Sequence, residues 1–192
     1  MRIRFILLIL TVISFGACKS PEARRPVTQN SGSFIDQSIA RNKELVAKEE
    51  AVIEKMIQQD SIKEYIASAN GFWYYYNKQT TDSLNIKTPE FGDVVKFDYT
   101  INDLNGNVIY DEGELPTKRY AIDKEELFGG LREGLKLMKE GEVVTFIFPS
   151  HKAFGYYGDK NRIGTNIPII TKVSLNSITT ENDLNTNSNS NN

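Results

Sequence analysis

The strongest constraint on the fold is a run of short apolar segments, separated by turn signals, between residues 71 and 179. In one of them Val95, Phe97, Tyr99 and Ile101 alternate with polar residues, as in a strand with one buried face. Four further segments have a strand-like character: 72–76, 108–110, 143–148 and 169–178. Because Asn105-Gly106 is a hairpin turn signal, the connections favour antiparallel pairing.

One helical segment interrupts the strands. Asp123-x-x-Glu126 is a helix-start signal, and Gly141 marks the end of the segment. The apolar ridge of this helix would consist of Leu127, Leu131, Leu135 and Met138. The pattern therefore predicts an α+β domain over 71–179, with an antiparallel sheet wrapped around one short helix.

Residues 34–70 form an amphipathic helical segment before this domain. Apolar residues recur at helical spacing after Ser33, a plausible N-cap, and Ser61-x-x-Glu64 predicts a break and a short second helix through Ile66, ending at Asn70-Gly71. The apolar stripe must be buried against something. Two interpretations stay open: the stripe packs on its own domain, or it is a self-association arm that forms a homodimer.

Residues 1–17 have the layout of a signal peptide. Two arginines precede the apolar run 5–15, which is shorter than the about 20 residues that span a bilayer. Gly16-Ala17-Cys18 resembles the bacterial lipobox, although Phe15 stands where that motif prefers Leu. This resemblance implies lipidation at Cys18 and an envelope protein that is anchored to a membrane and faces the periplasm. The alternative is an ordinary cleaved signal. Residues 18–33 then predict a flexible tether, and residues 180–192 a disordered Asn/Ser-rich tail.

Composition excludes several classes of function. The formal charge is −2, from 23 basic and 25 acidic residues, so the basic excess of a nucleic-acid binder is missing. One Cys and one His exclude an intrachain disulfide and a zinc site built from several such ligands. His151 lies beside Lys152 in a predicted loop, without a nucleophile motif, and is expected at the surface. We therefore expect no metal, no cofactor and no nucleic-acid partner.

Four segments in this order resemble the FKBP-type peptidyl-prolyl cis/trans isomerases: 92–99, 105–111, 127–138 with Gly141, and 149–155. With the lipobox and the preceding helix, the chain is most similar to the gliding-motility-associated FKBP-type isomerase lipoproteins of Bacteroidetes. The resemblance implies an isomerase that assists the folding of envelope or exported proteins at X–Pro bonds, in the service of gliding motility. Its clients would be proline-containing polypeptides, and it would need no cofactor.

The resemblance also implies a site: an apolar cup for a proline ring. Tyr99 and Asp111 match the catalytic positions, where the tyrosine hydroxyl bonds the carboxylate. The main-chain N–H of Phe128 matches a donor to the ligand. The matching substrate-binding set is Tyr110, Leu127, Phe128, Leu131, Phe154, Ile163 and Thr171.

Three positions depart from the family pattern. Leu131 replaces a frequent Trp, Phe154 lacks the hydroxyl of the usual Tyr, and Thr171 replaces an aromatic wall residue on a strand face with Ile169 and Val173. These changes predict a wider and less aromatic cup. They also keep an alternative open, in which the chain is a non-catalytic FKBP-like binding or scaffold lipoprotein in an envelope complex.

Overall fold

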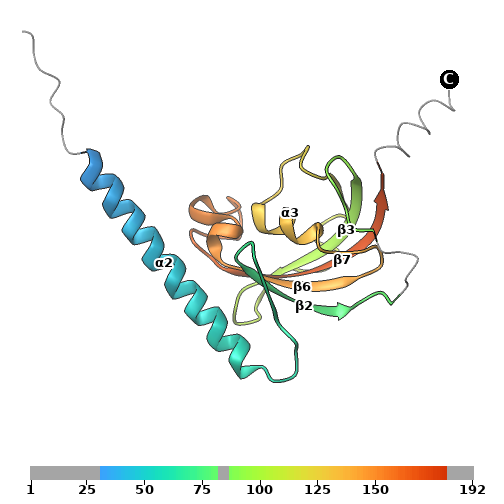
Figure 1. Cartoon of the computed structure of the whole chain (residues 1–192), viewed down its shortest axis with the longest axis horizontal. Helices are drawn as coiled ribbons and strands as arrows, with labels where there is room; N and C mark the ends of the chain where they lie inside the picture. The colour runs from blue at the N-terminus through green and yellow to red at the C-terminus, as the bar shows by residue number, and fades with distance from the viewer. Residues whose placement is uncertain (1–30, 82–86, 181–192) are drawn as a thin grey trace, which may run out of the picture. The chain divides into compact units, whose positions relative to one another are not determined.

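The computed structural model describes residues 31–81 and 87–180 (Figure 1). The expected signal peptide, Cys18, most of the tether and the tail from residue 181 lie outside the described residues. The chain divides into two compact units, 1–39 and 40–192. No helix in the described ranges is both long and apolar enough to cross a membrane.

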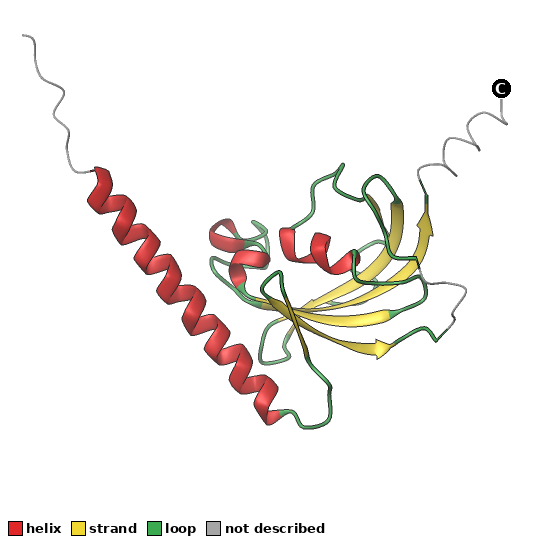
Figure 2. Ribbon diagram, in the orientation of Figure 1, coloured by secondary structure: helices red, strands yellow, loops and turns green. Residues whose placement is uncertain are grey.

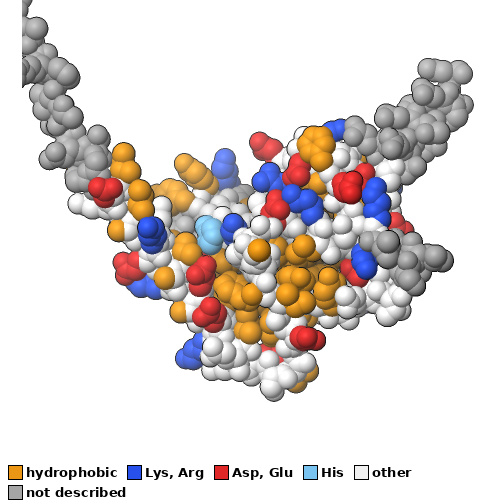
Figure 3. All heavy atoms as spheres, in the orientation of Figure 1, with side chains coloured by type: hydrophobic (Ala, Val, Ile, Leu, Met, Phe, Trp, Pro, Cys, Tyr) orange, Lys and Arg blue, Asp and Glu red, His pale blue; other side chains and the backbone are white. Residues whose placement is uncertain are grey.

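Helix α2, Ser31–Gln59, begins three residues earlier than the expected start at Phe34. It ends before Asp60, where the sequence predicts a break. Figure 3 shows apolar side chains interspersed with charged ones along this helix. In its first turns Phe34, Ile35 and Ile39 are 71%, 58% and 47% exposed.

The second half of α2 packs on the domain. Glu49 is 7% exposed, and Ile53, one turn later on the same face, is fully buried. The Glu49 carboxylate accepts hydrogen bonds from the main-chain N–H of Ser150 at 2.8 Å and from its hydroxyl at 2.7 Å. The apolar stripe is therefore divided: the part around Ile53 is buried within its own unit, and the first turns are exposed.

The expected second helix is absent: residues 61–65 form a loop, and residues 66–68 form one strand of a hairpin. Strand β1, Ile66–Ser68, pairs antiparallel with β2, Phe72–Lys78, with Ile66 opposite Tyr74. Gly71 closes the turn with φ +76° and donates its N–H to the Ser68 carbonyl at 3.1 Å. Asn70-Gly71 thus acts as a turn signal rather than a helix end, because the aromatic residues after it need a strand partner.

Within residues 31–81 and 87–180, the sheet has seven strands, all paired antiparallel (Figure 2). Their order is β1-β2-β6-β7-β3-β4, and β5 also pairs with β3. The remaining bounds are β3 Val94–Asn102, β4 Val108–Tyr110, β5 Lys118–Ala121, β6 Val143–Phe148 and β7 Ile169–Thr179. Four match the predicted strands, whereas β5 has no counterpart among them.

Helix α3, Gly129–Leu135, lies on the inner face of the sheet (Figure 1). It begins later than the signal at Asp123 predicts, because Asp123 has φ +57° and cannot continue a right-handed helix. Gly130 lets α3 approach the sheet closely, since a Cβ there would lie 2.5 Å from the Phe148 ring. The α+β class, with a sheet around one short helix, is confirmed.

The core lies between α3 and the inner face of the sheet. Phe146 and Phe148 of β6 stack at 5.6 Å between ring centroids, and Phe72 meets Phe148 edge-on at 5.2 Å. Other fully buried members of this cluster include Phe97, Ile101, Leu131, Leu135, Met138, Ile169 and Val173. Leu127, Phe128 and Phe154 pack against this aromatic and aliphatic layer.

Candidate functional site

A pocket of about 610 Å³ opens at the N-terminal end of α3. Tyr99 of β3, Leu127 and Phe128 before α3, and Phe154 after the short 3₁₀ turn Ser150–Lys152 line it. The structure thus brings together four of the predicted site residues from three separate stretches of the chain. Charged side chains complete the lining: Lys118, Glu125, Glu126 and Arg132.

Two phenylalanines form the aromatic wall of this pocket. The rings of Phe128 and Phe154 lie 4.9 Å apart, and Phe128 also meets Phe148 edge-on at 5.5 Å. Phe128 is the N-cap of α3, with an extended backbone at φ −62° and ψ 141°. Its carbonyl accepts the N–H of Arg132 at 3.2 Å, while no described group accepts a hydrogen bond from its own N–H. That amide is free to donate to a ligand carbonyl.

Tyr99 supplies a hydroxyl to the pocket. Its ring is half-buried and lies 5.5 Å from the ring of Phe97. Burial, with a smaller contribution from Tyr110, raises the pKa of Tyr99. Within the described residues the hydroxyl has no hydrogen-bond partner. It is also not one of the buried polar atoms that lack a partner. It is therefore accessible to solvent or to a ligand.

Three predicted binding residues lie behind the pocket rather than in its open wall. Leu131 and Thr171 are fully buried, and Ile163 is 3% exposed. Thr171 sits on the central strand β7, between Ile101 of β3 and Phe146 of β6. The expectation that Thr171 widens the cup therefore fails, because its neighbours enclose it completely. Its hydroxyl has no hydrogen-bond partner.

The predicted hydrogen bond between Tyr99 and Asp111 is not formed. Asp111 is exposed, and its carboxylate accepts the main-chain N–H of Glu112 at 2.7 Å. The tyrosine–carboxylate contact joins another pair: the Tyr110 hydroxyl donates to Asp159. Asn161 adds a hydrogen bond from its side-chain amide to the same hydroxyl at 3.0 Å.

Arg162 links this contact to the loop after β4. Its guanidinium pairs with both carboxylate oxygens of Glu114, at 3.0 and 2.9 Å, and donates to the Ile109 carbonyl at 2.8 Å. Arg162 also lies 4.9 Å from the centre of the Tyr110 ring. Sequence reasoning missed these partners, because only the folded loop brings residues 159–162 against β4.

Asp159 holds its own loop in place. Burial alone would raise the pKa of its carboxyl, but hydrogen bonds from Tyr110 and from the main-chain amides of residues 161–163 lower it. One of these amides, Ile163 N–H, donates at 2.8 Å. The Asp159 carboxylate therefore holds the main chain at Ile163, whose side chain belongs to the core cluster. In the part of the chain that the structure describes, no cluster of His, Cys, Asp or Glu could hold a metal ion.

Comparison with known proteins agrees with this geometry. A family profile for FKBP-type peptidyl-prolyl cis-trans isomerases matches residues 86–176, the stretch that holds α3 and the pocket. The chain is therefore similar to this family over 91 of its 192 residues. The similarity covers one continuous stretch that contains all four of the segments noted in the sequence.

One curated relative is the probable FKBP-type peptidyl-prolyl cis-trans isomerase FkpA of Neisseria meningitidis serogroup B, 29% identical over 128 residues. These cover 67% of this chain and 44% of the relative, so the chain spans less than half of that protein's length.

Two solved structures share the fold. FkpA from Escherichia coli has a TM-score of 0.56 at 19% identity, over 93% of this chain and 82% of that one. A peptidyl-prolyl cis-trans isomerase from Pseudomonas syringae pv. tomato has a TM-score of 0.56 at 17% identity, over 72% and 96%.

Proposed function

We propose that the chain is a peptidyl-prolyl cis/trans isomerase that acts on X–Pro bonds of polypeptides. One observation carries the proposal: an aromatic pocket in an FKBP-type domain combines Leu127, Phe128 and Phe154 with two unengaged donors. These donors are the Tyr99 hydroxyl and the Phe128 N–H. A proline ring fits the apolar walls, and its carbonyl needs such donors.

The chemistry requires neither a nucleophile nor a metal. Rotation about the X–Pro bond is slow because amide resonance gives a barrier of about 18–20 kcal/mol. Moving the amide from water into an apolar pocket weakens the solvation of the planar, charge-separated form. Donors that are already placed can then hold the twisted carbonyl. The Phe128 and Phe154 rings would supply the apolar surface, and the Tyr99 hydroxyl and the Phe128 N–H would supply the donors.

The residues take different parts in this scheme. Leu127, Phe128 and Phe154 would contact the proline ring, and Tyr99 would orient the carbonyl. The buried Leu131, Ile163 and Thr171 would support the pocket from the core cluster. Tyr110 packs against the same cluster but does not line the pocket. Asp111 remains a proposed catalytic residue: it would act through its charge, or by turning from the Glu112 amide toward Tyr99.

The test is an isomerisation assay on a tetrapeptide series Ala-X-Pro-Phe with wild-type protein, Asp111→Ala and the neighbouring control Glu112→Ala. Wild-type protein should accelerate isomerisation above background. Asp111→Ala should lower kcat/KM about ten-fold, which corresponds to about 1.4 kcal/mol, and the control should retain wild-type activity. An unchanged rate in Asp111→Ala would remove this carboxylate from the mechanism.

A non-catalytic scaffold is the second candidate, and Phe154 is the observation that favours it. Its ring packs on Phe128 at 4.9 Å and has no hydroxyl to bond a ligand carbonyl. A scaffold would bind proline peptides in the pocket without accelerating their isomerisation. Binding without turnover in the same assay would select this function.

The cellular setting is also part of the proposal. The sequence supports an envelope lipoprotein that is anchored through Cys18 and acts on exported clients, and its resemblance to the Bacteroidetes lipoproteins supports a role in gliding motility. Cys18→Ser should move the protein from the membrane fraction to the soluble fraction. Retention in the membrane fraction at high salt would exclude the acyl anchor.

Self-association through α2 remains a proposal for its first turns only. Phe34, Ile35 and Ile39 expose apolar surface there, and a second copy of this chain could cover it. If so, replacing all three with Ser should convert a dimer to a monomer in light scattering. Equal mass for both proteins would exclude the dimer.

A further inference from the structure

The edge of β2 is only partly covered. Strand β1 is three residues long and pairs with Phe72–Tyr74, whereas β6 pairs with the other edge of β2 as far as Lys78. Continuing the β1 register would place Glu64 opposite Tyr76, but no such pair is present. From Tyr75 onward, this edge of β2 has no strand partner within the described residues.

Tyr76 presents its main-chain groups to the open edge. The hairpin closes with Gly71 N–H on the Ser68 carbonyl, so Phe72 and then Tyr74 direct their N–H and C=O groups toward β1. Alternate residues of a strand point these groups to the same side, which places those of Tyr76 on this edge too. The edge thus offers a donor and an acceptor to an added strand.

The loop before β1 is fixed by contacts of Asp60 and Tyr75. The Asp60 carboxylate accepts the Ile62 N–H at 3.1 Å and the Tyr65 hydroxyl at 2.9 Å, and pairs with the Lys63 ammonium at 3.1 Å. Tyr65 meets Tyr75 edge-on at 5.1 Å, and the Lys63 ammonium lies 4.9 Å from the centre of the Tyr75 ring. Hydrogen bonds from Lys63, the Ile62 amide and Tyr65 lower the pKa of Asp60 to about 2. These contacts pack the side chains of the loop before Ile66 against Tyr75, and its main chain does not continue the pairing of β1 with β2.

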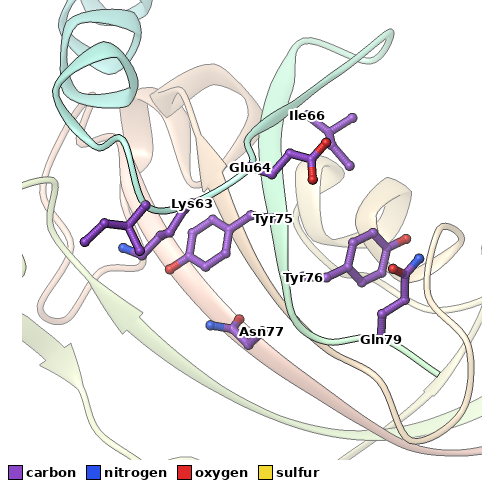
Figure 4. Close-up of a pocket in the computed structure, with 8 residues that line it drawn as sticks. Lys63, Glu64, Ile66, Tyr75, Tyr76, Asn77 and Gln79 are labelled. Carbon is purple, nitrogen blue, oxygen red and sulfur yellow. The ribbon is translucent and has the colours of Figure 1, made fainter. Parts of the chain in front are cut away.

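The resulting pocket has a volume of about 590 Å³ (Figure 4). Figure 4 shows Glu64 and Ile66 on one side of the opening and Tyr76 and Gln79 on the other. Ile66 and Tyr76 offer apolar surface, and Gln79 offers an amide. Lys63 is engaged by Asp60, whereas Glu64 has no hydrogen bond or ion pair to any described residue. The unmatched charge at the opening is therefore negative.

We propose that this pocket binds an extended polypeptide segment, which adds to the open edge of β2 in line with β1 and places a Lys or Arg side chain against Glu64. Main-chain hydrogen bonds to Tyr76 would supply general affinity, as in other cases of strand addition. The Glu64 charge would supply the preference for basic segments. This site holds a segment without requiring proline, so it does not depend on the proposed isomerase activity.

The test uses a peptide without proline, which the pocket around Tyr99 is not expected to bind. Its sequence is Thr-Lys-Val-Thr-Val-Lys-Thr, with capped ends. Titrated into the ¹⁵N-labelled mature chain, it should shift the amide signals of residues 74–79 and 62–66. A peptide with Glu in place of both Lys residues should bind more weakly. A Lys peptide methylated at alternate main-chain nitrogens on the pairing edge should not bind.

Variants of Glu64 give a matched comparison. Glu64→Gln should weaken binding of the Lys peptide about three-fold, as expected for an exposed ion pair, and Glu64→Lys should reverse the preference between the two peptides. Thermal melts of both variants should match that of the wild type. No shift at millimolar peptide, equal binding of the methylated peptide, or an unchanged preference in Glu64→Lys would each overturn the proposal. Shifts of the same residues on dilution, without peptide, would assign the edge to a second copy and also overturn it.

Discussion

Two hydroxyls on neighbouring strands face the same side of the sheet and differ in one respect. Tyr99 of β3 and Thr171 of β7 both lack a hydrogen-bond partner among the described residues. Tyr99 lines the pocket and is half-buried, whereas Thr171 is fully enclosed between Ile101 and Phe146. The two hydroxyls therefore differ in their access to the pocket.

This difference shows where the open pocket ends and the packed core begins. A hydroxyl that reaches the pocket can be satisfied by water or by a substrate carbonyl, so it costs little in the empty protein. A sealed hydroxyl without a partner costs about 1–3 kcal/mol of stability. Tyr99 is thus suited to binding, whereas Thr171 weakens the core that supports the site.

The largest expected effect comes from filling the enclosed position. Thr171→Phe should destabilise the protein by about 2 kcal/mol, because added volume in a packed core forces its neighbours apart. That corresponds to a fall in Tm of roughly 4–8 °C for a protein of this size. If the variant instead keeps its Tm and binds a pocket ligand more tightly, Thr171 lines an open wall and the boundary must be redrawn.

The next effect concerns the accessible hydroxyl. Tyr99→Phe should lower kcat/KM about ten-fold, or about 1.4 kcal/mol, because it removes a donor to the twisted carbonyl. Its Tm should stay close to the wild-type value, since no internal hydrogen bond is lost. Tyr156→Phe is the control, since Tyr156 is 70% exposed and does not line the pocket. Full activity in Tyr99→Phe would show that the hydroxyl is not used.

A smaller effect of opposite sign is expected for Thr171→Val. Valine keeps the shape of threonine and removes the unpaired hydroxyl, so stability should rise by about 1 kcal/mol. Denaturant unfolding would measure the gain, with Thr100→Val on the outer face of β3 as the control. A loss of stability would mean that a buried water satisfies the Thr171 hydroxyl.

The smallest expected change is in the pH profile. Burial raises the pKa of Tyr99 above its ordinary value of about 10, so its hydroxyl keeps its proton at all lower pH values. Isomerase activity should therefore be nearly constant between about pH 6 and 9. A bell-shaped profile centred near neutrality would indicate a titrating group that the pocket does not contain.

The sequence predicted the central strands because two patterns are each compatible only with a β-strand. These are the alternation of apolar and polar residues in 95–101 and the apolar run 143–148. It failed at 66–71 and at 123, where one signal is compatible with two structures. Asn70-Gly71 can end a helix or form a hairpin turn, and the strand partner of Phe72 decides. Asp123 can begin a helix, but its φ of +57° places it in the turn before α3.

The site could be predicted from the sequence only in part. Tyr99, Leu127, Phe128 and Phe154 follow from the resemblance, because their positions depend on strands and a helix with clear signals. The contact between Tyr110 and Asp159 does not follow, since it depends on how an irregular loop returns to β4. The complete burial of Thr171 depends on how closely its neighbours pack, and the amino-acid sequence does not show this packing.

The contact between Glu49 and Ser150 has a mechanical consequence. Ser150 begins the 3₁₀ turn that leads, four residues later, to Phe154 in the pocket wall. Its carbonyl also accepts the N–H of Ala153 at 3.0 Å, so the turn is a stiff unit. A force that tilts the second half of α2 must either break two hydrogen bonds or carry this turn with it. Tension on the helix would thus be transmitted to the Phe154 wall of the pocket.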